Sequence, residues 1–232
     1  VTRRQIRGRA EAAVISGRAD MYRVAREALA GRADAPPTPD APTPEQQQAA
    51  IRAALDLAAA DMPARDALVE TATAGVAEAD AFLREADIIS LPPEPVRVIL
   101  MPEFQRGFAV AYLDAPGPLE RELGSFYAVS PIPDDWTDAQ ATSFLREYNN
   151  RGILDIAVHE SSPGHYVQLW HANAYPSVLR AVLSSGSFVE GWAVYAEEMM
   201  VEQGFRAGDP LYRLSQLKVQ LRTIPNAIID QA

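Results

Sequence analysis

His159-Glu160-Ser161-Ser162-Pro163-Gly164-His165 is the stretch of sequence around which the rest of the chain is arranged. A second stretch, residues 187–193, follows it and reads Ser-Phe-Val-Glu-Gly-Trp-Ala. The chain has three histidines, and all of them (His159, His165 and His171) fall within this one short region. Such a concentration of imidazoles indicates a metal or catalytic site there.

The spacing of the first two histidines differs from that of the zinc-protease helix H-E-x-x-H, whose histidines share one helix face and reach one Zn²⁺. On an unbroken helix His159 and His165 would lie roughly 120° apart around the axis and about 9 Å apart along it. Pro163 lacks an N–H and clashes with the carbonyl of His159, and Gly164 can take a φ above zero. We therefore expect two residues to loop out and return His165 to the side of His159. The alternative is a helix that ends at Ser162, with both histidines on the rim of a turn.

Glu190 opens a predicted helix and supplies a carboxylate downstream of the histidine pair. Two histidines and one carboxylate form a zinc site that leaves a coordination position open for water. Glu197 lies about 10.5 Å further along the helix, so both carboxylates cannot bind one ion. We predict Glu190 as the ligand, and Glu197 as the acceptor of a ligating histidine's other ring N–H or the holder of a substrate amine. A solvated helix face is the alternative for Glu197.

The two stretches together resemble the DUF885 family of bacterial proteins, which is similar to the gluzincin and carboxypeptidase-Taq-like zinc metallopeptidases. The matching positions are His159, Glu160, Pro163, Gly164, His165, Phe188, Glu190, Gly191, Trp192, Ala193, Tyr195, Ala196 and Glu197. The resemblance is strongest over residues 94–231. It implies a zincin-like helical architecture, with His159, His165 and Glu190 as Zn²⁺ ligands and Glu160 as general base. Family members are longer, so we expect this chain to be partial, with a catalytic region that is incomplete at its C-terminus.

The expected function is zinc-dependent hydrolysis of a peptide bond or of a small amide substrate. Stabilisation of the oxyanion is expected from a donor such as Tyr166, Tyr195 or His171, or from a residue outside the chain. A surface or core-edge imidazole is the alternative for His171. Two other functions stay open: a non-catalytic helical binding module, and a metal-dependent amide or ester hydrolase with non-peptide substrates.

Composition excludes several classes of protein. The net charge is −10, with acidic residues scattered along the chain, which argues against a nucleic-acid partner. No apolar run is long enough to span a membrane, and no signal peptide is visible. The chain has no cysteine, so histidine and carboxylate are the expected metal ligands. A cytoplasmic or an exported protein fits equally, and no oligomeric state is indicated.

Hydrophobic periodicity predicts a mainly α fold with a small antiparallel β-sheet, in the α+β class. We expect an N-terminal helical segment over residues 1–35, a proline-rich linker or loop over 36–44 and a helical segment over 45–90. Residues 91–232 should hold the sheet and the helical metal-binding region. Strands are predicted at 96–100, 108–112 and 125–129, with an edge that can accept an extended peptide. Capping boxes are predicted at Thr43 and Thr137, and a last helix from Pro210 should kink or end before Pro225.

Overall fold

The structure, a computed structural model, describes residues 1–120 and 123–230 and divides into two compact units. One unit combines Val1–Asp61 with Arg206–Ala232, and the other is Met62–Phe205. The first unit thus joins segments from the two ends of the chain, whereas we expected successive segments. Each unit has its own cluster of buried side chains.

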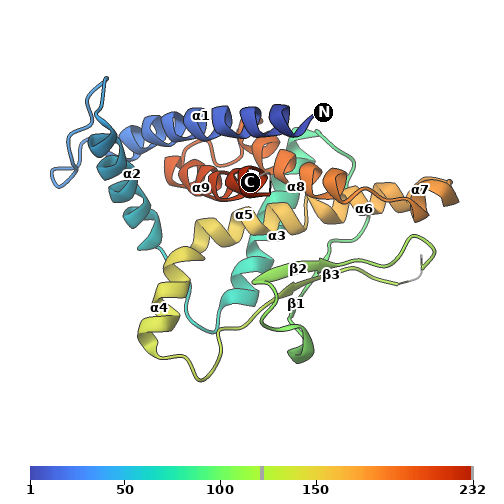
Figure 1. The fold of residues 1–232 in the computed structure, drawn as a ribbon. Coiled ribbons are helices and arrows are strands. Elements are labelled where there is room, and N and C mark those ends of the chain that lie inside the picture. The colour runs from blue at the N-terminus through green and yellow to red at the C-terminus, as the bar shows by residue number, and fades with distance from the viewer. Residues whose placement is uncertain (121–122, 231–232) are drawn as a thin grey trace. The chain divides into compact units, whose positions relative to one another are not determined.

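Three helices make up the described part of the first unit: α1 (Arg3–Leu29), α2 (Pro44–Ala59) and α9 (Pro210–Ile229). α1 packs against both α2 and α9, as Figure 1 shows for the blue and red helices. The buried side chains of the three helices meet in one cluster, formed by Met21, Tyr22, Val24, Ala25, Leu29, Ala50, Ile51, Ala54, Leu214 and Leu217.

Local sequence signals explain the helix ends of this unit. The predicted capping box at Thr43 is confirmed, with the hydroxyl accepting from the main-chain N–H of Gln46. The proline-rich segment before it is a loop, as predicted, held by a 2.7 Å hydrogen bond from the Tyr22 hydroxyl to the carbonyl of Pro39. Of the two alternatives predicted for the last helix, an end before Pro225 is wrong, because α9 continues to Ile229. Proline removes only one N–H donor from the helix, and the remaining hydrogen bonds carry the helix past it.

The second unit contains a three-stranded sheet of β1 (Arg97–Leu100), β2 (Ala111–Asp114) and β3 (Phe126–Val129), in the order β1-β3-β2. The mainly helical α+β class is confirmed, but the prediction of an antiparallel sheet is wrong in part. β2 pairs antiparallel with β3, whereas β1 pairs parallel with β3. The segment between β1 and β3 includes a 3₁₀ turn, η1 (Glu103–Gln105), and all of β2, which is long enough to return the chain to the starting end of β1.

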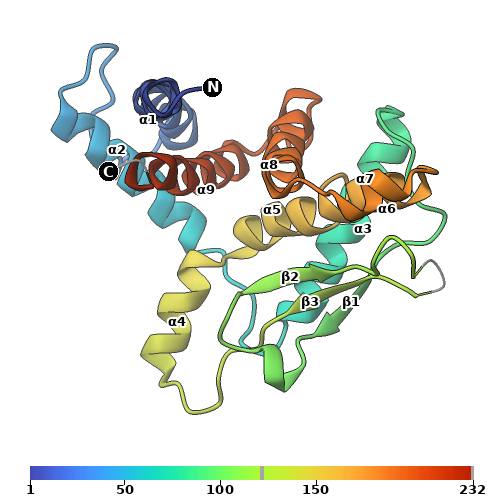
Figure 2. The same cartoon turned by 45° about the vertical axis from the view of Figure 1, so that its right-hand side comes forward.

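The described residues of the second unit also form six helices. They are α3 (Leu68–Ala86), α4 (Asp138–Glu147), α5 (Asn150–Glu160), α6 (His165–Ala174), α7 (Val178–Val182) and α8 (Gly186–Glu202). The predicted capping box at Thr137 is confirmed at the start of α4. α8 begins four residues before its predicted start at Glu190. Figure 2 shows α3 and α5 beside the strands, and both helices contact the sheet.

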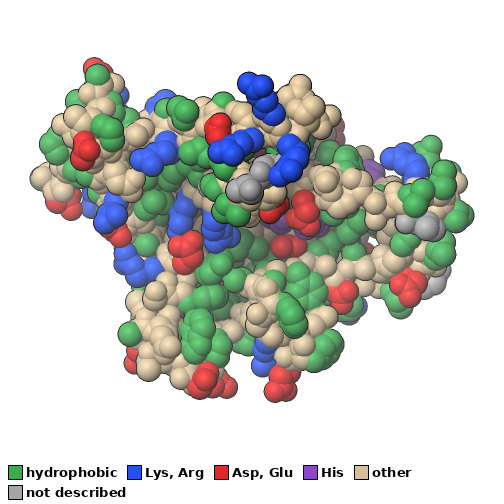
Figure 3. All heavy atoms as spheres, viewed as in Figure 1, with side chains coloured by type: hydrophobic (Ala, Val, Ile, Leu, Met, Phe, Trp, Pro, Cys, Tyr) green, Lys and Arg blue, Asp and Glu red, His purple; other side chains and the backbone are tan. Residues whose placement is uncertain are grey.

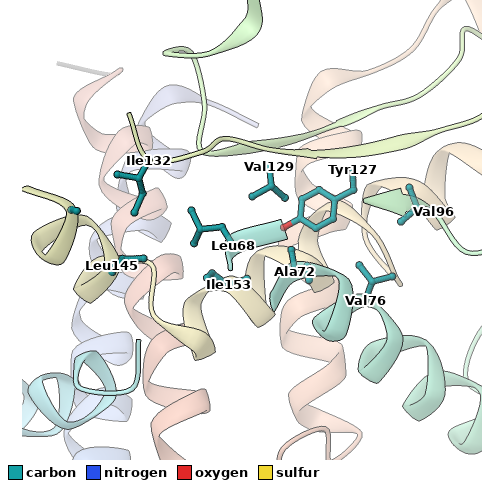
Figure 4. Close-up of a cluster of buried hydrophobic side chains, with 11 residues drawn as sticks. Leu68, Ala72, Val76, Val96, Tyr127, Val129, Ile132, Leu145 and Ile153 are labelled. Atoms are coloured by element: carbon teal, nitrogen blue, oxygen red, sulfur yellow. The ribbon is translucent and has the colours of Figure 1, made fainter. Parts of the chain in front are cut away.

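The core of the second unit lies between α3, α5 and the sheet. Figure 4 shows Tyr127 and Val129 of β3 pointing toward Leu68 and Ala72 of α3. The whole cluster consists of Leu68, Ala72, Val76, Val96, Tyr127, Val129, Ile132, Ala141, Leu145, Ile153 and Ala157. Gly75 permits the close crossing of α3 and α5, because a Cβ there would lie 3.2 Å from the Cβ of Ala157. The helix that carries the first histidine of the motif is therefore anchored in the core.

Apolar side chains also reach the surface of this unit, over α7. Val178, Leu179 and Leu183 are each about two-thirds exposed, and Figure 3 shows hydrophobic side chains gathered at that end of the molecule. Within the described residues, no helix combines the length and the apolar character needed to cross a lipid bilayer.

Candidate metal centre

A turn between α5 and α6 brings the first two histidines together. α5 ends at Glu160 and α6 begins at His165, so the break covers four residues, 161–164, rather than the two predicted. The ring centroids of His159 and His165 lie 4.7 Å apart, with the ring planes perpendicular. The predicted return of His165 to the side of His159 is confirmed.

Gly164 makes this turn possible, but not in the way that the sequence suggested. Its φ is −69°, so the expectation of a positive φ is wrong. Glycine is needed because a Cβ at this position would collide with the carbonyl group of His159. The N–H of Gly164 donates to the carbonyl of Val158 over 3.1 Å and holds the turn against the last turn of α5.

α8 approaches the histidine pair with two carboxylates that have different roles. Oε1 of Glu197 lies 2.6 Å from Nδ1 of His159, and the Glu197 side chain is 2% exposed. This hydrogen bond leaves Nε2 of His159 available to bind a metal ion, as in the carboxylate–histidine pairs of metal sites. Oε2 of Glu190 lies 4.0 Å from Nε2 of His159 and 3.7 Å from Nε2 of His165. Glu197 therefore bonds to the ring of His159, and Glu190 lies close to both imidazoles, while its role as a metal ligand stays a prediction.

The three candidate ligands fit a tetrahedral metal ion. One nitrogen or oxygen atom from each of His159, His165 and Glu190 lies within 4.8 Å of the other two. Bonds of about 2.0–2.1 Å at tetrahedral angles place ligand atoms about 3.4 Å apart. Oε2 of Glu190 lies about 0.3–0.6 Å beyond this spacing from the Nε2 atoms of the two histidines, and its side chain, which is 71% exposed, has room to close that gap.

The electrostatics of the two imidazoles also suit a metal. Burial, reinforced by the charge of His159, lowers the pKa of His165 to about 4 and keeps its ring neutral, which is the form that binds metal ions. Burial also lowers the pKa of His159, but the hydrogen bond and charge of Glu197 outweigh this effect and raise it overall. Glu197 therefore makes the His159 ring a more basic ligand.

Glu160, the predicted base, lies between the histidine helix and the sheet. The main-chain N–H of Leu113 in β2 donates to its Oε2 over 2.9 Å. Burial raises the pKa of Glu160 to about 7, against the opposing effects of His159 and of the Leu113 hydrogen bond. A carboxylate with a pKa near neutrality is suited to accept and return a proton.

Two contributors to the site were missed in the sequence. The main-chain N–H of Leu113 has no side-chain signature, so no motif could indicate it. Trp192 lies in the second stretch of the motif, and we predicted no role for it. Its indole N–H donates to the carbonyl of Pro163 over 2.8 Å. Nothing in the spacing of residues predicts either contact.

The remaining predicted residues lie in different surroundings. The Tyr166 hydroxyl donates to the carbonyl of Glu94, and Nε2 of His171 is hydrogen-bonded to the carbonyl of Ser90. Both side chains thus hold the loop between α3 and β1. Tyr195 is half exposed, with its ring 5.9 Å from that of Trp192. An oxyanion-stabilising role for any of these three side chains stays a prediction.

Comparison with known proteins gives a family and a fold. The chain matches the family described as "Bacterial protein of unknown function (DUF885)" over residues 1–232. A solved candidate lipoprotein of unknown function from Shewanella oneidensis is 31% identical, with a TM-score of 0.83 over 99% of this chain and 40% of that chain. A candidate lipoprotein from Colwellia psychrerythraea is 19% identical, with a TM-score of 0.71 over 100% of this chain and 36% of that chain, and shows the fold alone. The chain thus spans less than half the length of these two solved proteins, and no curated protein matches it.

Proposed function

The chain belongs to the DUF885 family of bacterial proteins, and we propose that it carries the metal centre of a zinc-dependent hydrolase that cleaves peptide bonds. The convergence of His159, His165 and Glu190, with Glu160 beside them, is the observation that carries this proposal. Bound there, Zn²⁺ would supply a Lewis acid that makes water reactive near neutral pH.

Each residue of the proposed site has a separate task. His159, His165 and Glu190 hold the ion, and Glu197 orients the ring of His159 through its Nδ1 atom. Leu113 holds Oε2 of Glu160, which leaves Oε1 to take a proton from the attacking water and deliver it to the leaving amine. Burial of the histidine helix along α3 limits the access of bulk water and strengthens these interactions.

The position of β2 favours a peptide over other amide substrates. β2 is an edge strand, and Leu113, opposite Tyr127, directs its N–H outward to Glu160. Main-chain N–H and C=O groups alternate in direction along an antiparallel strand, so those of Ala111 also face this outer edge. An extended peptide lying along this edge would pass beside the proposed base.

Metal analysis combined with hydrolysis assays on the full-length protein tests the proposal. We expect about one Zn²⁺ per chain, lost in His159→Ala and in Glu190→Ala. Glu160→Gln should keep the metal and lose the cleavage of a mixed peptide library, by about 10²–10⁴-fold. Glu202→Gln removes an exposed carboxylate from α8, the helix that carries Glu190, and serves as the matched control.

Three results would contradict the proposal in different ways. A wild-type protein without metal would remove the centre. An active Glu160→Gln variant would remove the base. Cleavage confined to esters or non-peptide amides would leave the metal site and change the substrate class.

We also propose that the protein acts outside the cytoplasm. The two solved proteins that share its fold are described as candidate lipoproteins, which supports export. Fractionation of cells that express the full-length gene tests this proposal, and recovery of the protein in the cytoplasmic fraction alone would contradict it.

A further inference from the structure

Trp192 connects α8 to the turn that aligns the two histidines. Its indole N–H donates to the carbonyl of Pro163 over 2.8 Å, and Pro163 lies between His159 and His165. Glu190 lies only two residues before Trp192 on α8. The same helix therefore carries the proposed carboxylate ligand and a direct contact to the backbone that places the other two ligands.

The large buried side chains of α8 lie toward its C-terminal end. The buried residues are Ala193, Ala196, Glu197, Met199 and Met200, and Glu197 is hydrogen-bonded to His159. Near Glu190 the buried face offers only Ala193, whose single methyl group fixes the rotation of the helix less than a large side chain does. A polar contact close to Glu190 therefore adds to what holds this end of α8.

Glu190 and Trp192 stand on opposite edges of that buried face. At about 100° per residue, the two side chains lie about 160° apart around the helix. On the Glu190 side, the buried Glu197 bonds to His159, two turns further along. On the other side, the hydrogen bond of Trp192 lies close to Glu190 along the axis. A turn of α8 that lengthened this bond would move the carboxylate of Glu190 relative to both imidazoles.

We infer that Trp192 is a positioning residue, whose hydrogen bond to Pro163 sets the approach of the Glu190 carboxylate to His159 and His165. The inference rests on the proposed metal site. Glu190 depends on such a device because its side chain is 71% exposed and so has little packing to hold it.

The ring of Trp192 has a second role, which the test must separate from the first. It contacts the rings of Phe188 and Tyr195, at centroid distances of 6.5 and 5.9 Å. Trp192→Phe keeps an aromatic ring for these contacts and removes the N–H. Trp136→Phe is the matched control, since Trp136 lies in the same unit and packs on Phe144.

Zinc titration against a chromophoric chelator provides the readout. Loss of a group that orients a metal ligand typically weakens metal affinity about 10- to 100-fold. We expect Trp192→Phe to raise the Kd for Zn²⁺ about 10-fold and Trp136→Phe to leave it unchanged. Circular dichroism of the metal-free proteins should show both variants folded.

A double-mutant cycle shows whether Trp192 acts through Glu190. Glu190→Ala loses the zinc that co-purifies with the protein, but titration at high Zn²⁺ still measures the residual affinity of the two histidines. In that background, Trp192→Phe should have no further effect on the affinity for Zn²⁺. An unchanged Kd in Trp192→Phe alone, or an equal loss with and without Glu190, would overturn the inference. Unfolding of metal-free Trp192→Phe would overturn it too, because Trp192 would then hold α8 in the fold. A wild-type protein that binds no zinc would overturn the proposed function and this inference together.

Discussion

Replacement of Gly164 by alanine tests the geometry of the histidine turn with a single methyl group. Gly164 lies against the carbonyl group of His159, and an added Cβ would overlap its carbon and oxygen atoms. These are main-chain atoms at the end of α5, so no change of side-chain rotamer can relieve the overlap. The turn has to open, which moves His165 away from His159.

The expected cost follows from the kind of overlap. Overpacking by one methyl group costs about 1–3 kcal/mol. We expect the upper end, because the overlap is with backbone atoms. Restriction of the unfolded chain by alanine offsets about 0.4–1 kcal/mol of this cost. A net loss of about 2–3 kcal/mol corresponds to a fall in Tm of about 5–10 °C for a protein of this size.

Calorimetry of the metal-free protein measures the loss of stability, and zinc titration measures the effect on the site. We expect both the lower Tm and an increase of about 10-fold or more in the Kd for Zn²⁺. Gly191→Ala is the matched control, because a Cβ at this position of α8 meets no atom within 4 Å. It should stabilise the helix by about 0.5–1 kcal/mol and leave the affinity for Zn²⁺ unchanged.

A Gly164→Ala variant with the Tm and the zinc affinity of the wild type would show that the contact between Gly164 and His159 does not control the turn. A fall in Tm with unchanged zinc affinity would show that the turn relaxes without moving His165.

Three further predictions concern the supporting contacts and the core. Glu197→Gln replaces the charged acceptor of His159 with a neutral one, so the Kd for Zn²⁺ should rise about 10- to 100-fold in a competition titration. An unchanged Kd would show that Glu197 does not affect the binding of Zn²⁺ by His159. Leu113→Pro removes the N–H that holds Glu160 without removing a hydrogen bond between β2 and β3. Zinc should stay bound while the rate of hydrolysis falls about 10- to 100-fold, and full activity would exclude this contact from catalysis. Leu83→Ala truncates a fully buried side chain of α3 and should lower the free energy of unfolding by about 2–5 kcal/mol in denaturant titrations, and a loss below about 1 kcal/mol would mean that the cavity collapses.

Much of the local structure was predictable because its causes lie within a few residues of one another. The capping boxes at Thr43 and Thr137 start their helices as expected, since each uses two side chains three residues apart. The convergence of His159 and His165 was predictable from Pro163 and Gly164 for the same reason.

Other features depended on contacts between distant segments. The parallel pairing of β1 with β3 was not predictable, because three short apolar strands carry no signal for the direction of pairing. The hydrogen bonds from Leu113 to Glu160 and from Trp192 to Pro163 were missed because their acceptor or donor is a main-chain group, which is the same in every residue.

The amino-acid sequence by itself determined which side chains can bind a metal, where the two helices with capping boxes begin and that the chain must turn between the two histidines. Only the tertiary structure decided how the site is held: Gly164 against the His159 carbonyl, Glu197 on the His159 ring, and β2 beside Glu160. Helix caps and turns are set by neighbours in the chain, whereas the distance between two ligands on different helices depends on how tightly those helices pack.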